Sequence, residues 1–216
     1  MNAIRILHVT RTLDPSEGLL PRLAVRIAAE QAEAGHNVTL LTMDNTHTMV
    51  HAQQAYGHLA GYQRIHIYHS RERGGLSYLF GNSAIQWMRP IVTRLSVIHL
   101  HGMWEALLRR AAQLGRKHGV PVVVTPHPCH AAPAPRFTRP VLDLMMRVSW
   151  SGLLKQAAMV HALDDGDERR LREMGLRENI FHLPDGMELA ARVTHSYPLG
   201  GKLPKAVACA LAARPA

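Results

Sequence analysis

Two short segments carry histidines at spacings that could bind a metal ion. "HLHG" contains His99 and His101, and "TPHPCH" contains His127 and His130 on either side of Cys129. Imidazole and thiolate groups are zinc ligands, and strand ends that lie next to each other could bring them together. Alternation along a strand points His99 and His101 the same way but does not bring the second pair into range, and fifteen histidines make chance clusters common. We therefore expect no bound metal. His127 alone, at a strand end, could still hydrogen-bond a bound hydroxyl.

A second candidate site is the turn before "LLPRLAVRIAAEQAEAG", a segment with the apolar spacing of a helix. Gly18 stands directly before this helix. A helix N-terminus preceded by glycine presents unpaired backbone N–H groups and a partial positive charge, which suit a phosphate. The sequence has neither G-x-G-x-x-G nor G-x-x-x-x-G-K-[ST], so the usual dinucleotide and P-loop interpretations lack support. The turn indicates anion binding without naming the anion.

The acidic residues near these turns do not form a recognisable catalytic set. Asp14, Glu17 and Glu105 lie in or beside the turns, but their spacing marks neither a carboxylate pair nor a nucleophile with its base. Each suits a helix cap or an exposed surface equally well. The sequence therefore assigns no catalytic residue.

The composition predicts a globular protein that attracts anions. The 216 residues are 47% hydrophobic, which is enough for the core of one α/β domain. A formal net charge of +9 favours nucleic acid, anionic lipid or phosphorylated molecules as partners. Aromatic residues make up only 5% and are not interleaved with the arginines, which argues against a stacking surface for nucleic acid. We expect no nucleic-acid partner.

Several features predict a cytoplasmic location. No apolar stretch reaches the roughly 18 residues of a membrane span, and the first residues lack the zones of a signal peptide. Cys129 and Cys209 give no disulfide framework, which fits a reducing compartment. The amphipathic segment 139–157 could contact the inner face of a membrane, although core packing explains the same pattern.

Short apolar runs alternate with segments of helical periodicity along most of the chain. This alternation predicts a doubly wound, mainly parallel sheet with helices on both faces, whose ligands bind beyond the carboxyl ends of the strands. We expect strands within residues 4–9, 37–42, 64–69, 96–102, 120–127, 158–163 and 179–186. We expect helices within residues 19–35, 76–95, 103–119, 139–157 and 164–175, and a less regular segment between 43 and 63.

Three segments, taken in order, resemble the N-terminal domain of family-four glycosyltransferases of the GT-B type. They are "IRILHVTRTLDPSEGLLPRLAVRIAAEQAEAGHNVTLLT", "SVIHLHGMWEALLRRAAQLGRKHGVPVVVTPH" and "AAMVHALDDGDERRLREMGLRENIFHLPDGMEL". The chain differs from the family in having Leu19 beside Gly18 where glycines are commonly paired. It also has Pro128 after His127 where the family commonly has glycine, and "PDG" in place of "PNG".

The resemblance implies transfer of a sugar from a nucleotide-sugar to a hydroxyl of a glycan or lipid-linked acceptor, with no cofactor and no obligatory metal. Gly18 and Leu19 then correspond to the loop that approaches the donor diphosphate. His127 corresponds to a strand-end histidine that contacts the transferred sugar, and His101 and Gly102 correspond to the turn on the acceptor side.

In that family the N-terminal domain shapes the acceptor site and a second, similar domain binds the nucleotide-sugar. We expect a Rossmann-like domain over residues 1–189 and a poorly specified tail over 190–216 that is too short for the second domain. The expectation is therefore an inactive acceptor half that associates with itself or with a separate chain.

Two other interpretations stay open. The basic charge also fits a non-catalytic protein that binds anionic lipid or phosphorylated ligands. The histidine segments also fit a small metal-dependent hydrolase.

Overall fold

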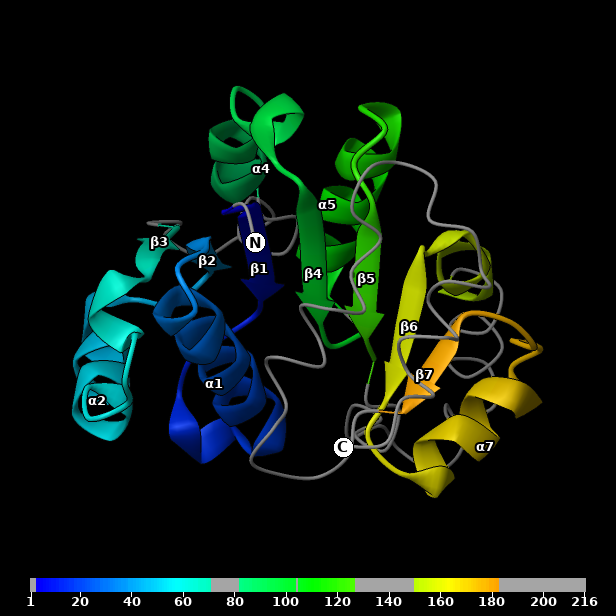
Figure 1. Ribbon diagram of the computed structural model, residues 1–216, viewed down its shortest axis with the longest axis horizontal. Helices are drawn as coiled ribbons and strands as arrows, with labels where there is room; N and C mark the ends of the chain where they lie inside the picture. The colour runs from blue at the N-terminus through cyan, green and yellow to red at the C-terminus, as the bar shows by residue number, and fades with distance from the viewer. Residues whose placement is uncertain (1–2, 71–81, 104, 127–149, 183–216) are drawn as a thin grey trace.

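The computed structural model describes residues 3–70, 82–103, 105–126 and 150–182. These residues form a seven-stranded, all-parallel sheet in the order β3-β2-β1-β4-β5-β6-β7. Figure 1 shows the strands side by side in this order. Their bounds are β1 Arg5–Thr10, β2 Asn37–Thr42, β3 His66–His69, β4 Val97–His101, β5 Val122–Thr125, β6 Met159–Ala162 and β7 Ile180–His182. The predicted fold class and all seven predicted strands are confirmed.

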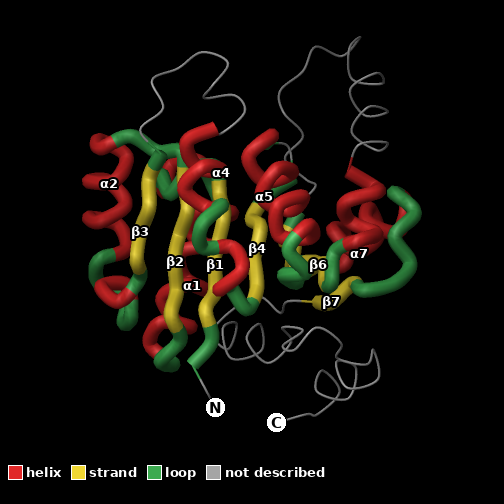
Figure 2. Tube along the Cα trace, turned by 90° about the horizontal axis from the view of Figure 1, so that it is seen from above, coloured by secondary structure: helices red, strands yellow, loops and turns green. Residues whose placement is uncertain are grey.

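Helices connect the strands and flank the sheet (Figure 2). The α-helices are α1 Leu19–Glu33, α2 Thr46–Tyr56, α4 Asn82–Met88, α5 Ala106–Lys117 and α7 Asp165–Glu173. Residues 150–156 are also helical. Three short 3-10 turns are η1 Pro15–Glu17, η2 Tyr62–Arg64 and η3 Val92–Arg94.

Local signals set several helix ends as predicted. The Asp164 side chain caps α7 by accepting a hydrogen bond from the Asp167 backbone at 2.7 Å. Gly35, Gly119 and Gly175 follow α1, α5 and α7 with positive φ, the conformation that ends a helix without a Cβ clash. The predicted helix over 76–95 is shorter among the described residues, because α4 stops two residues before Pro90.

The segment 43–63 contains a helix that the sequence pattern does not predict. Asn45 caps α2 through its side chain, which accepts from the Thr48 backbone at 3.0 Å. Only Ala52 and Tyr56 of this helix are buried, so its sequence does not show the repeating apolar positions that predict a helix.

The core has two halves, one on each face of the sheet. Leu7 and Val9 of β1 pack with α4, α5 and the 150–156 helix, whereas Ile6 packs with α1 and α2. Because side chains alternate along a strand, His8 shares the α1 face with Ile6. The predicted tail, 190–216, and most of the predicted helix 139–157 lie outside the described residues.

Candidate functional site

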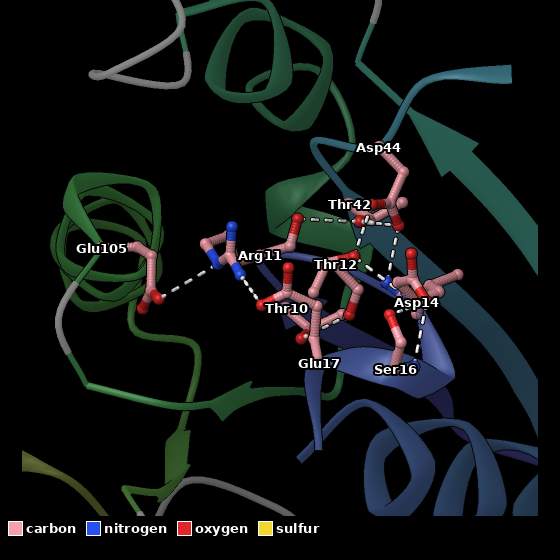
Figure 3. Close-up of polar contacts among 10 residues, drawn as sticks. Thr10, Arg11, Thr12, Asp14, Ser16, Glu17, Thr42, Asp44 and Glu105 are labelled. Carbon is pink, nitrogen blue, oxygen red and sulfur yellow. Dashed lines mark hydrogen bonds and ion pairs between the residues drawn. The ribbon is translucent and has the colours of Figure 1, made fainter. Parts of the chain in front are cut away.

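The loop after β1 is held in place by one buried carboxylate that follows β2. Asp44 accepts hydrogen bonds from the Thr12 hydroxyl at 2.6 Å, the Leu13 backbone N–H at 2.6 Å and the Thr42 hydroxyl at 2.8 Å. These contacts join the carboxyl ends of β1 and β2 (Figure 3). The loop is therefore built by the fold before any ligand arrives.

This loop leads into the N-terminus of α1 through Gly18. The Asp14 carboxylate accepts from the Ser16 hydroxyl at 2.7 Å and the Ser16 backbone at 2.9 Å, and these hydrogen bonds hold the pKa of Asp14 below its usual value. Gly18 has φ 105°, no side chain caps α1, and Leu19 is 48% exposed. The first turn of this 15-residue helix therefore has no side-chain cap, and Leu19 and Leu20 carry its first N–H groups because Pro21 has none.

The turn after β4 lies beside this loop. Thr10 and His101 are register partners in β1 and β4, so both turns leave the same edge of the sheet. Gly102 has φ 107°, and a Cβ there would lie 3.8 Å from Leu20 at the start of α1. The structure thus brings together Gly18, Leu19, His101 and Gly102 at one edge.

One arginine joins the two turns electrostatically. Arg11 pairs with Glu17 at 2.5 Å and approaches Glu105 at 3.7 Å, and Figure 3 shows it between them. The Arg11 and Glu17 side chains are 42% and 48% exposed. The arrangement neutralises part of the acidic charge beside the α1 N-terminus.

Beneath this edge, four buried histidines share the α1 face of the sheet. They are His8, His99, His101 and His161, each 2% exposed or less. Burial lowers the pKa of His8 to about 4 and that of His161 to about 3, and it lowers the pKa of His99 and His101 well below the usual value. All four imidazoles are therefore neutral near pH 7.

The outcome for the predicted histidine pairs is mixed. His99 and His101 do point the same way, with ring centroids 4.1 Å apart. The neighbours they gain among the described residues are His8 and His161, which the spacing of the histidines does not single out. His127, Cys129 and His130 lie outside the described residues. A hydrophilic residue within the apolar run "IRILHV" is the signal that could have identified His8.

A protein-family model matches most of the chain. Residues 21–186 match the family model described as a glycosyl transferase 4-like domain. The chain belongs to this family. The match begins at Pro21, within α1, and includes the described strands from β2 to β7 but not β1, Gly18 or Leu19, so the family assignment rests on most of the sheet.

Two solved structures have the same fold. A glycosyltransferase from Rickettsia africae superposes with a TM-score of 0.55 at 14% identity, covering 87% of this chain and 44% of its own. Anabaena HepE, solved in complex with UDP and glucose, superposes with a TM-score of 0.59 at 15% identity, covering 85% of this chain and 45% of its own. The family member described here therefore spans a little less than half the length of these structures.

No curated protein sequence matches the chain significantly. Among the residues that the structure describes, no helix is both long enough and apolar enough to cross a bilayer.

Proposed function

We propose that this chain supplies the acceptor-side domain for transfer of a hexose from a nucleotide-sugar to a hydroxyl of a glycan or lipid-linked acceptor. The observation that carries the proposal is the family match over residues 21–186. The similar fold of Anabaena HepE, a protein solved with UDP-glucose, supports a nucleotide-sugar as the donor.

In this proposal Gly18 and Leu19 face the donor diphosphate. The uncapped N-terminus of α1 supports the assignment, because its backbone N–H groups favour an anion at this edge. Gly18 has open space where a Cβ would stand, so a ligand can approach the backbone closely.

The acceptor side is assigned to the turn after β4. His101 and Gly102 are both buried, so we propose that they shape this turn beneath the acceptor site rather than offer the acceptor a side chain. The sugar contact assigned to His127 stays a prediction. No cofactor and no catalytic metal take part in the proposed transfer.

We further propose that the chain alone binds donors weakly and does not turn them over. A few backbone hydrogen bonds at the α1 N-terminus contribute about 1 kcal/mol each, which is too little for tight binding. The remaining donor contacts are proposed to come from a second domain or a separate chain.

Saturation-transfer NMR with UDP-, GDP- and ADP-glucose, combined with a donor-hydrolysis assay, tests both statements. We expect NMR saturation transfer to one of the three nucleotide-sugars and no hydrolysis of any of them. Saturation transfer to none of them would reject a donor-facing loop, and hydrolysis would reject the inactivity of the chain alone.

A matched pair of glycines localises the binding. Gly18 and Gly35 both have positive φ and no atom within 4 Å of an added Cβ, but they lie at opposite ends of α1. Gly18→Ala is expected to abolish the transfer signal, whereas Gly35→Ala leaves it intact. Equal losses would indicate backbone strain rather than a binding role.

A further inference from the structure

A hollow opens at the edge of the sheet where the amino ends of the strands lie. Its volume is about 640 Å³, within the range of small-molecule sites. The lining comes from the first residues of β1, β2 and β3, from the end of α1 with the residues that follow it, and from the segment 91–95 around η3. In Figure 1 this edge lies at the top, beside the N-terminus and α4. The proposed donor and acceptor contacts lie at the other edge, so the proposed function does not use this hollow.

Polar side chains from three neighbouring strands point to the same face of the sheet at this hollow. Ile6 packs toward α1, and side chains alternate along a strand, so Arg5 points to the opposite face, where α4 lies. Asn37 is the register partner of Arg5 and shares its face, as does Thr39 two residues further along β2. His66 of β3 is the register partner of Thr39. One arginine, one amide, one hydroxyl and one imidazole therefore lie along one face of the hollow.

The segment around η3 brings a second arginine to the hollow. The Arg5 backbone N–H donates to the Ser96 hydroxyl at 3.2 Å, and the Ser96 backbone N–H donates to the Arg5 carbonyl at 2.9 Å. Arg94 lies two residues before Ser96 and lines the hollow, together with the half-buried apolar side chains of Ile91 and Leu95. Two arginines from distant parts of the sequence thus border the same hollow, next to an apolar wall.

The positive charge of these two arginines is not neutralised by acids. Among the residues that the structure describes, neither Arg5 nor Arg94 forms an ion pair, and no acid lines the hollow. Arg64, a third arginine in the lining, is already engaged, because it pairs with the Glu33 carboxylate and donates to the Glu33 carbonyl, both at 3.4 Å. It thereby offsets the partial negative charge at the end of α1. The excess positive charge rests on Arg5 and Arg94.

The chemistry of this lining matches a phosphate group. A guanidinium only donates, and its planar fork binds phosphate oxygens in pairs. The amide of Asn37, the hydroxyl of Thr39 and the imidazole of His66 can each donate one further hydrogen bond. A phosphate monoester carries a charge of about −1.5 to −2 near pH 7, which two guanidinium groups balance. The hollow is large enough to hold an organic group beside the phosphate, against the apolar wall.

We propose that this hollow binds a phosphate monoester between Arg5 and Arg94, with Asn37, Thr39 and His66 as further donors. The ligand is a second one, separate from the sugar donor, because the two sites lie at opposite edges of the sheet. A small soluble molecule and a lipid headgroup present the same phosphate chemistry, and the experiment below separates these two sources.

Arginine side-chain NMR of the wild-type chain with glycerol 3-phosphate tests the site without any variant. We expect the Nε–H signals of Arg5 and Arg94 to shift in a saturable way, whereas those of Arg109 and Arg116 on α5 stay in place. Glycerol, which lacks the phosphate, is expected to shift none of them. Equal shifts at all four arginines would show general charge attraction and would overturn the proposal.

Charge-matched variants measure the contribution of each group. Arg5→Gln and Arg94→Gln are each expected to weaken phosphate binding by roughly tenfold, because each removes charge-assisted hydrogen bonds. Arg116→Gln changes the net charge equally and is expected to have no effect. Thr39→Val keeps the charge but removes one donor, and is expected to weaken binding by roughly fivefold. Equal weakening by Arg5→Gln and Arg116→Gln would contradict a built site.

Vesicles that contain phosphatidic acid identify the source of the phosphate. Saturable shifts with glycerol 3-phosphate, without vesicle binding that depends on Arg5 and Arg94, would place the phosphate on a small soluble molecule. Vesicle binding that Arg5→Gln and Arg94→Gln each weaken, without a response to glycerol 3-phosphate, would place it on a lipid headgroup. No response of Arg5 and Arg94 to either probe would refute the site.

Discussion

Asp44 shows how much of the candidate site depends on a single side chain. Its two carboxylate oxygens accept from Thr12, Leu13 and Thr42, and the residue is only 7% exposed. In Asp44→Asn, one acceptor becomes an NH₂ group that faces donors. We expect the free energy of unfolding to fall by about 1–3 kcal/mol, measured by urea denaturation.

Glu33→Gln is the matched control for this change. Glu33 pairs with Arg64 at 3.4 Å, but both side chains are largely exposed, at 49% and 61%. Loss of such a surface pair is expected to cost less than about 1 kcal/mol. If the two variants lose the same stability, the Asp44 contacts do not anchor the loop.

Tyr56 gives the opposite case, a polar group whose removal is expected to help. Its hydroxyl is buried and has no hydrogen-bond partner among the described residues, and burial raises its pKa to about 12. The unfolded chain releases this proton near pH 10, whereas the folded chain holds it to about pH 12. The titration of Tyr56 therefore leaves the free energy of unfolding unchanged below about pH 10 and lowers it as pH rises toward about 12.

The variant Tyr56→Phe is therefore expected to equal or exceed the wild type in stability near neutral pH. It is also expected to lose less stability between about pH 10 and about pH 12, because it lacks the titrating hydroxyl. Urea midpoints across this range measure both effects. A variant that is clearly less stable at neutral pH would reveal a hydroxyl partner.

At the scale of elements, the packing of α1 against η2 depends on a close approach at Gly61. This residue has φ 80°, and an added Cβ would lie 2.1 Å from the backbone oxygen of Ala29. Gly61→Ala is expected to lower the free energy of unfolding by more than the roughly 1–3 kcal/mol of a left-handed residue alone. Gly35→Ala, with φ 91° and open space, is expected to show the strain alone. Similar losses in the two would mean that the α1–η2 contact readjusts.

The sequence predicts elements well where one segment carries its own signal. The apolar runs "NVTLLT" and "AMVHAL" coincide with β2 and β6 to within one residue at each end. Helix α2 is not predicted. Its cap at Asn45 is a local signal, but too few of its residues are buried to give the apolar spacing of a helix. The parallel pairing of the strands follows from the helical crossovers between them.

The candidate site is predictable only in part, because its contacts join residues far apart in the sequence. Since Gly18 and His101 both lie at or just beyond the carboxyl ends of parallel strands, their position at one edge of the sheet is predictable. The contact between His8 and His101, 93 positions apart, depends on the pairing register of β1 and β4. The spacing of residues along the sequence does not give this register. The contact between Asp44 and Thr12 is unpredictable for the same reason, because it joins the ends of two different strands.

At the scale of the whole molecule, one hollow at the edge opposite the candidate site is lined by basic residues. Arg5, Arg64 and Arg94 line this hollow together with His36 and His66, and its lining includes no acid. Arg64 also pairs with Glu33 from α1. With a formal net charge of +9, this edge is where the chain is expected to meet anionic lipid.

Vesicle flotation tests this expectation. The chain should float with phosphatidylserine-containing vesicles at low salt, stay behind with neutral vesicles, and release as salt shortens the screening length below about 8 Å. Arg5→Gln with Arg94→Gln should weaken flotation more than Arg109→Gln with Arg116→Gln on α5, which changes the net charge equally. Equal effects of the two double variants would show that total charge, and not the hollow, attracts the membrane. Flotation with neutral vesicles would instead indicate an apolar contact with the membrane, because such a contact does not depend on lipid charge and is not weakened by salt.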